Sequence, residues 1–156
     1  MYQGDEPIAH GEGTCLYKCG SSYVGNWKHG NWDGKGTLIW KNNYSCVGQW
    51  IKNKWHGNCE VKYSNGEIYT SIYRGEFNND QEHGKGCFSW QDGTIYTGDF
   101  SEGKKTGHGT FTWPTGGKFE GNVVDGRAEG YGTFWYSQGS RYEGYWVNDK
   151  KEGLGK

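Results

Sequence analysis

The sequence is poor in the side chains that form most protein cores. Leu, Ile, Val and Phe together make up 21 of its 156 residues, with only two prolines and one methionine. A chain this poor in apolar residues ordinarily stays disordered, because it cannot bury enough apolar surface. Nine Trp and twelve Tyr nevertheless raise the aromatic share to 17%, and glycine occurs 29 times. This composition predicts a few large rings packed close to bare backbone.

Glycine at this density excludes a helical bundle, since each glycine inside a helix costs about 1 kcal/mol relative to alanine. Glycine does not recur at every third residue, so a collagen triple helix is excluded as well. These exclusions favour an all-β structure that is thin and rich in aromatic rings.

The charge balance limits the partners. The formal net charge is −1, and neither half of the chain is strongly basic, so we expect no nucleic-acid partner. The sequence shows no signal peptide and no apolar run of about 18 residues, so we expect a cytoplasmic protein. The five cysteines are an odd number without a Cys-x-x-Cys pair, which indicates reduced thiols.

A period of 23 residues organises the chain. With Tyr23 as position zero, glycines follow at positions two, eleven and thirteen, and aromatic residues at positions four and seventeen. The pattern restarts at Cys46, Tyr73, Tyr96, Phe119 and Tyr142. We therefore interpret residues 1–156 as one array, with a partial unit over 1–22, full units from 23, 46, 73, 96 and 119, and a partial unit over 142–156.

Each unit is expected to be a β-hairpin. The segments Tyr-x-Gly-x-Trp and Gly-x-Phe-x-Trp alternate with period two, as strands do when one face is apolar. Polar, glycine-bearing segments such as residues 29–33 lie between them and predict the hairpin loops. The turns into the next hairpin are predicted at Asn65-Gly66, Asp92-Gly93, Thr115-Gly116 and Gln138-Gly139.

The pattern also predicts a register. We expect position two to pair with position fifteen, so that a glycine such as Gly75 lies opposite a ring such as Phe88. An aromatic ring across from a glycine stabilises a strand that glycine would weaken. From Cys46 to Tyr73 the spacing is 27 residues instead of 23. We expect the extra residues, around 69–72, to form a longer loop or a local bend.

The pattern Y-x-G-x-W-x-x-x-x-x-x-G-x-G-x-x-x-W, in seven copies that cover the whole chain, resembles the MORN (membrane occupation and recognition nexus) repeat family. The resemblance implies an elongated, twisted, single-layer antiparallel sheet of consecutive β-hairpins. It also implies a binding or scaffolding module, as in junctophilins and plant phosphatidylinositol phosphate kinases, with any catalysis in a separate domain. The sequence departs from the pattern at Cys46, Cys59 and Val123, which replace Tyr, Gly and Trp.

No arrangement of side chains predicts catalysis. His10, His56 and His83 share position ten, but equivalent residues of neighbouring units lie about 10 Å or more apart, too far to share a metal. The segment 30–37 lacks the Gly-Lys-Ser/Thr order of a phosphate loop. Carboxylates are scattered over the predicted turns without a catalytic constellation. We therefore expect a protein that is not an enzyme and that binds no cofactor and no metal.

The aromatic row is the predicted interaction surface. A single-layer sheet cannot cover its own rings, so one face stays open to an extended or helical segment of another protein. We expect a protein–protein interaction scaffold that binds this segment on a concave aromatic face. The predicted contact residues are Tyr23, Trp27, Trp40, Trp50, Tyr63, Tyr73, Phe77, Trp90, Tyr96, Phe100, Trp113, Phe119, Tyr136 and Trp146.

Two tryptophans lie outside the repeat pattern. Trp32 and Trp55 share position nine, which the pattern places in a hairpin loop. They either contact a partner or pack on each other and on the sheet, and both interpretations are open. At the same position the other units carry Glu82, Lys105, Ala128 and Lys151. A second, smaller aromatic patch is predicted on the opposite face, formed by Tyr131, Trp135 and Tyr145.

Two other functions are open. One is a peripheral phospholipid- or phosphoinositide-binding module, although a net charge of −1 gives little attraction to anionic lipid, worth about 1 kcal/mol per basic residue. The lysines that would contact its headgroups are Lys104, Lys105, Lys150 and Lys151. The other is a regulatory segment of a larger enzyme, since the sequence starts and stops within a repeat.

Unpaired strands at the two ends of the array predict end-to-end association, most simply a homodimer through a terminal unit. A scaffold of this kind is expected in the cytoplasm, at cytoskeletal or membrane-associated structures.

Overall fold

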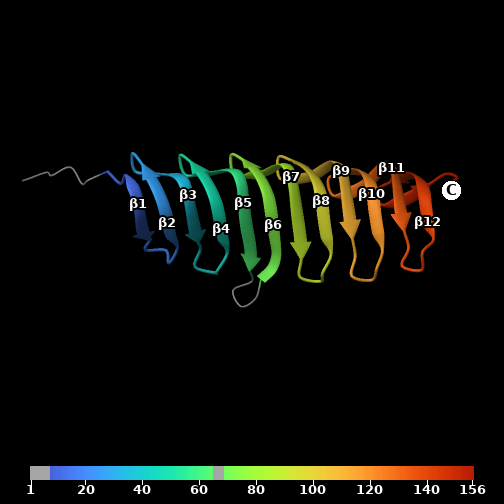
Figure 1. The fold of residues 1–156 in the computed structure, drawn as a ribbon, viewed down its shortest axis with the longest axis horizontal. Helices are drawn as coiled ribbons and strands as arrows, with labels where there is room; N and C mark the ends of the chain where they lie inside the picture. The colour runs from blue at the N-terminus through green and yellow to red at the C-terminus, as the bar shows by residue number, and fades with distance from the viewer. Residues whose placement is uncertain (1–7, 65–68) are drawn as a thin grey trace, which may run out of the picture.

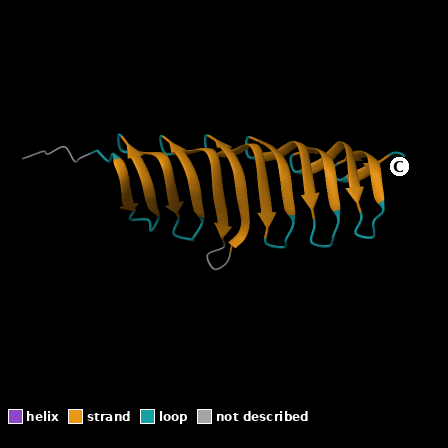
Figure 2. Cartoon of the chain, viewed as in Figure 1, coloured by secondary structure: helices purple, strands orange, loops and turns teal. Residues whose placement is uncertain are grey.

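Thirteen antiparallel strands form one open sheet in strict sequence order (Figure 1). The structure is a computed structural model that describes residues 8–64 and 69–156. Within these ranges the secondary structure consists of strands joined by loops and turns (Figure 2). The predicted all-β, single-layer array of consecutive hairpins is confirmed. Among the described residues, no helix meets the length and hydropathy needed to cross a membrane.

The strands are β1 (Gly11–Leu16), β2 (Ser22–Lys28), β3 (Asn31–Ile39), β4 (Ser45–Ile51), β5 (Lys54–Ser64), β6 (Tyr69–Asn78), β7 (Gln81–Trp90), β8 (Ile95–Ser101), β9 (Lys104–Thr112), β10 (Lys118–Val124), β11 (Arg127–Trp135), β12 (Arg141–Val147) and β13 (Lys150–Glu152). The units that begin at 23, 46, 73, 96, 119 and 142 are called units one to six below. Strand β1 belongs to the partial unit that precedes unit one.

Each hairpin closes with a two-residue turn. Strand β2 ends at Lys28 and β3 begins at Asn31, so only His29 and Gly30 form the turn, with φ of 51° and 77°. Positive φ at both central residues is typical of a type I′ turn, whose twist matches that of the paired strands. The same signs recur at 52–53, 79–80, 102–103, 125–126 and 148–149. The predicted loop over 29–33 is therefore too long, because residues 31–33 belong to β3.

The turns between units lie where the sequence predicts them. Gly93, Gly116 and Gly139 have φ of 87°, 90° and 92°, which suits glycine. The backbone of the residue at position seventeen closes each of these turns with two hydrogen bonds. In the turn after Trp113, for example, the Trp113 carbonyl oxygen accepts from the Gly116 N–H (2.9 Å), and the Trp113 backbone N–H donates to Gly117 O (3.0 Å). The predicted turn at Asn65-Gly66 lies outside the described residues.

The predicted register is wrong by two residues. Gly75 pairs with Gly86 rather than with Phe88, and Phe88 pairs with Tyr73. The same shift occurs in the other units. The two-residue turn pairs Trp27 with Trp32 near the hairpin tip, and a bulge in the returning strand at Gly34 (φ of 105°) then moves the pairing by two residues, so that Gly25 pairs with Gly36. A bulge places extra residues on one strand, and its left-handed backbone favours glycine.

The insertion in unit two lengthens strands. The returning strand β5 has 11 residues, whereas β3 and β9 have 9 each. The outgoing strand β6 has 10 residues, whereas β4 and β8 have 7 each. Residues 69–72 therefore lie in β6 and do not form the predicted longer loop. The alternative, a local bend, agrees with a bulge at this point, because Tyr63 pairs with Ser71 and Ser64 with Tyr69, so that the pairing skips Thr70. The pairing of the lengthened strands is irregular only between Tyr63 and Ser64. An even insertion adds to both strands of a hairpin and leaves the face of every later side chain unchanged.

One row of directly paired side chains crosses the whole sheet, and together with buried side chains beside it, such as Trp50, Phe77 and Trp146, it forms the core. The members of the row are Cys15, Tyr23, Leu38, Cys46, Val61, Tyr73, Phe88, Tyr96, Phe111, Phe119, Phe134 and Tyr142. Beside this row runs a row of paired glycines, and each position-zero ring lies over them. A Cβ added to Gly86 would lie 2.6 Å from Tyr73 Cε2. The glycines are covered by rings as predicted, but by diagonal rather than directly opposite neighbours.

In unit two, both residues of the contact between the position-zero ring and the position-thirteen glycine are replaced. Cys46 stands where other units have the ring, and Cys59 where they have the glycine. Their exposed fractions are 0% and 5%. A hydrogen bond from the Cys46 thiol to the Cys59 sulfur raises the pKa of Cys46 and lowers that of Cys59. The two departures from the repeat pattern therefore compensate each other.

Candidate functional site

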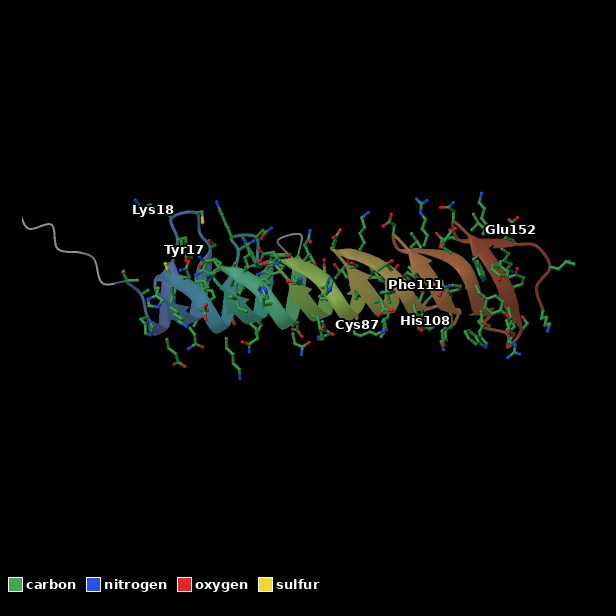
Figure 3. All side chains as sticks on the ribbon, turned by 90° about the horizontal axis from the view of Figure 1, so that it is seen from above. Tyr17, Lys18, Cys87, His108, Phe111 and Glu152 are labelled. Carbon is green, nitrogen blue, oxygen red and sulfur yellow. The ribbon has the colours of Figure 1, made fainter. Side chains whose placement is uncertain are left out.

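The predicted aromatic row lies on one face of the sheet, called the aromatic face below. Seen from above, the sheet is a long twisted ribbon with side chains on both sides (Figure 3). Phe111 and His108, three residues apart in β9, lie on opposite faces. Eight residues of the row are buried: Tyr23, Trp50, Tyr73, Phe77, Tyr96, Phe100, Phe119 and Trp146. Six are half-buried and line the open side: Trp27, Trp40, Tyr63, Trp90, Trp113 and Tyr136.

The aromatic face carries a groove of about 550 Å³ over units three to six. Trp113 and Tyr136 line it from beside the exit turns, and Gly126 and Asp149 line it from the hairpin tips. The groove therefore extends across the aromatic face from the hairpin tips to the exit turns.

The side chains of Trp32 and Trp55 reach from the hairpin tips to the position-seventeen residues beside the exit turn of the preceding unit, Tyr17 and Trp40. Such a contact between positions nine and seventeen is called a bridge below. The Trp32 indole N–H donates to the Tyr17 hydroxyl (3.0 Å), and its ring stacks on Tyr23 with centroids 4.7 Å apart. The Trp55 ring lies 5.8 Å from the Trp40 ring. The expectation that both lie in loops is wrong, because the two-residue turn leaves position nine in a strand. Both rings pack on the sheet and are half-buried.

Unit three makes the same bridge with polar groups. Glu82 takes position nine, and its Oε1 accepts a hydrogen bond from the Tyr63 hydroxyl (2.8 Å). Tyr63 stands at position seventeen of the preceding unit, as Tyr17 and Trp40 do for the tryptophan bridges. Burial, followed by the nearby Glu82 charge, raises the pKa of Tyr63.

Units four and six make the bridge with lysines. Lys105 Nζ lies 4.8 Å from the centroid of the Trp90 ring, and Lys151 Nζ lies 4.8 Å from that of Tyr136. Cation–π contacts of this kind contribute about 0.5–2 kcal/mol, more when the cation is desolvated. Burial lowers the pKa of Lys105. Both lysines therefore lie within the aromatic face.

Unit five has only a methyl group at this position. Ala128 and Trp113, the two residues that would form its bridge, both line the groove. An alanine side chain is too short to reach across as the other position-nine residues do. The missing bridge explains why the groove opens in this part of the face. The sequence signal for it was the position-nine row of units one to six, in which Ala128 is the one small residue.

In units one to five the position-nine residue is held in place by the next hairpin tip. The Ala128 N–H donates to Asp149 Oδ1 (2.7 Å), and the Asp149 N–H donates back to Ala128 O (3.1 Å). The same pair of bonds links Trp32 with Asn53 and Trp55 with Asp80. Both the N–H and the carbonyl oxygen of Ala128 are therefore fixed by Asp149, although the Ala128 side chain makes no bridge.

The lysines of the predicted headgroup site do not share one edge. Lys104 and Lys105 are neighbours in β9 and so face opposite sides of the sheet. Lys104 pairs with Asp125 (3.1 Å), whereas Lys105 lies over the rings. Lys150 and Lys151 alternate in the same way in β13. Lipid binding by these residues stays a prediction.

The opposite face carries the second aromatic patch. Tyr131 and Tyr145 pair directly, with ring centroids 5.5 Å apart and exposed fractions of 48% and 62%. Trp135 lies further along β11 with Lys118 Nζ 4.7 Å from its ring. Among residues 8–64 and 69–156, no group of three or more His, Cys, Asp or Glu residues is placed to hold a metal ion.

Cys19 is expected to react first with iodoacetamide. It is exposed, and its hydrogen bond with the Ser21 hydroxyl (2.9 Å) lowers its pKa, which favours the reactive thiolate. Cys46 and Cys59 are buried and should react only when the sheet opens locally. Mass spectrometry after timed alkylation measures the order. Equal rates at Cys19 and Cys59 would contradict the burial.

Comparison with known proteins agrees with this architecture. The profile of the MORN repeat matches residues 23–43, 46–68, 73–95, 96–118, 119–141 and 142–156. No curated protein matches the chain. Among solved structures, it is similar to the SAS-4 (dCPAP) TCP domain in complex with a proline-rich motif of Ana2 (dSTIL) of Drosophila melanogaster. That chain is 14% identical with a TM-score of 0.40, over 93% of this chain and 86% of that one, too distant a likeness to support an argument about ligands. The six consecutive matches cover well over half of the sequence, and the chain therefore belongs to the MORN repeat family.

Proposed function

We propose that this chain is a non-catalytic scaffold that binds a segment of another protein on its aromatic face. The observation that carries the proposal is the groove of about 550 Å³, lined mainly by aromatic rings. Exposed apolar surface of this kind is typical of interaction sites, and Trp and Tyr are the residues that most often anchor them. Membership of the MORN repeat family supports the broader statement that the chain is a protein or membrane interaction module.

The shape of the groove suits a chain segment. It extends over units three to six, and each unit adds two strands, or about 10 Å, to the length of the sheet. An extended segment of about ten residues would cover it. The rings are held by the paired backbone on both sides, so the surface is formed before the partner arrives, which lowers the entropy cost of binding.

The proposal is tested by affinity capture from a cell lysate with matched variants. Trp113→Ala/Tyr136→Ala removes two rings from the aromatic face, and Tyr131→Ala/Tyr145→Ala removes two from the opposite face. Circular dichroism confirms that each variant retains its sheet, and cross-linking with mass spectrometry locates the contact. Proteins retained by the wild type and the opposite-face variant, but lost by the aromatic-face variant, would support the proposal. Equal retention by all three, or retention of membrane vesicles alone, would contradict it.

The terminal strands provide a further association surface. Among the described residues, β1 and β13 each pair with one other strand only, and an unpaired edge can pair with a second chain. We expect light scattering to show a mass that rises with concentration from 17.7 kDa towards twice that value. A constant monomer mass over a hundredfold range of concentration would contradict this expectation.

A further inference from the structure

The aromatic face contains one vacant place in an otherwise regular row. In five units the position-nine side chain contacts the position-seventeen side chain of the preceding unit. These contacts are Trp32 with Tyr17, Trp55 with Trp40, Glu82 with Tyr63, Lys105 with Trp90, and Lys151 with Tyr136. The sixth pair is Ala128 with Trp113, where the methyl group leaves the bridge unmade and the groove opens.

The chain itself shows which side chain fits this place. In units one and two the position is filled by an indole, and Trp32 packs between the rings of Tyr23 (4.7 Å) and Trp50 (5.1 Å). The equivalent residues in unit five are Phe119 and Trp146, which are 2% and 6% exposed and line the groove. The space beside Ala128 is therefore lined by two buried aromatic rings, as the site of Trp32 is in unit one.

We propose that the slot at Ala128 receives one aromatic side chain of the bound protein segment, and that acidic residues on either side of this anchor meet Lys105 and Lys151. The inference rests on the proposed scaffold function and names the chemistry of its partner. The anchor lies between Trp113, Phe119 and Trp146, in the position that Trp32 and Trp55 occupy in their own units. Aromatic anchors in such pockets contribute most to binding.

The charges around the slot support acidic flanks. The neighbouring positions on both sides of Ala128 in the row are lysines, one unit or about 10 Å away, which equals three residues of an extended chain. Within the described part of the chain, no carboxylate lies within ion-pair distance of Lys105 or Lys151.

Two carboxylates also line the groove, but each is held by the chain's own backbone. Asp149 Oδ1 accepts from the Ala128 N–H (2.7 Å), and Asp92 Oδ1 accepts from the Thr94 N–H (2.8 Å). One oxygen of each carboxylate is therefore already hydrogen-bonded to a backbone N–H of the chain. Lys105 and Lys151, in contrast, donate to no carboxylate of the described chain. Lys151 Nζ donates to the Tyr136 hydroxyl, and the charge of Glu82 acts on Lys105 from the neighbouring position of the row.

The experiment selects random twelve-residue peptides, displayed on phage, against the immobilised full chain. The selected peptides are expected to share Trp, Phe or Tyr with Asp or Glu about three residues away on one or both sides. Fluorescence polarisation then measures the affinity of the tightest peptide for the wild type and the variants. Its aromatic residue is also replaced by alanine, and that peptide is tested on the wild type.

Ala128→Trp rebuilds the missing bridge and is expected to weaken binding at least tenfold. Ala128→Ser leaves the slot open and serves as the matched control, with an expected change of less than twofold. Lys151→Glu should weaken binding several-fold, and the effect should diminish at high salt. The alanine-substituted peptide should lose at least tenfold on the unchanged protein, so the inference can be tested even if Ala128→Trp does not fold.

The outcomes separate the two proposals. Peptides that bind equally to Ala128→Trp and carry no common aromatic residue, but are lost by Trp113→Ala/Tyr136→Ala, would overturn the slot and leave the scaffold function intact. Peptides that the aromatic-face variant retains fully would overturn both proposals. Failure to select any binding peptide would likewise count against both.

Discussion

Replacing Trp50 by alanine is expected to lower the free energy of unfolding by about 4 kcal/mol, within the range for buried aromatic side chains. Trp50 is 1% exposed, and its indole N–H donates to Gly36 O (3.1 Å) in the neighbouring strand. Its ring also lies 5.6 Å from Tyr23 and 6.0 Å from Trp55. The substitution therefore removes a contact that joins units one and two, together with the partner of a buried carbonyl.

Urea denaturation followed by circular dichroism measures this loss. The matched control is Tyr145→Ala on the opposite face, where the ring is 62% exposed and its loss should cost less than about 1 kcal/mol. Because stability in a repeat array depends on contacts between neighbouring units, we expect the first unfolding step to shift most. Equal losses for the two variants would show that the aromatic face is not the core.

The second large effect concerns the ring that covers the paired glycines. A Cβ on Gly109 would lie 2.6 Å from Tyr96 Cζ, so Gly109→Cys alone should cost about 2–3 kcal/mol through overpacking. Tyr96→Cys alone should cost about 3–5 kcal/mol through the cavity it leaves. The double variant reproduces the arrangement of Cys46 and Cys59 in unit two. We therefore expect its loss to be smaller than the sum of the single losses by at least about 1 kcal/mol.

The coupling is measured as a double-mutant cycle in urea. Tyr96→Cys combined with Gly13→Cys provides the control, because these residues lie at distant points of the array and their effects should add. If the losses at Tyr96 and Gly109 also added, the compensating exchange inferred for unit two would be wrong.

Much of the fold could be predicted from the sequence because it repeats a local rule. The period fixes the number of hairpins, and turn residues such as Asp92-Gly93 mark their ends. The register could not be predicted, since it depends on the bulge near glycines such as Gly34, which changes the pairing without changing the sequence period. Nor could the fate of residues 69–72, because added residues can extend either a loop or two strands.

The candidate site was predictable in outline only. The period places the aromatic row on one face, as the structure confirms. The bridges could not be derived from it, because each joins residues of two different units and depends on the two-residue turn that puts position nine in a strand. Trp32 and Trp55 were therefore expected in loops, and Ala128 was named only as one of the four residues that lack an indole at that position.

The binding of a protein segment on the aromatic face is tested most directly by the indole N–H signals in a 1H–15N spectrum of the chain. Trp90 and Trp113 line the groove, whereas Trp135 lies on the opposite face. On titration with the tightest selected peptide, the signals of Trp90 and Trp113 are predicted to shift, while that of Trp135 stays in place. Shifts of Trp135 with unchanged signals from Trp90 and Trp113 would contradict the proposed function.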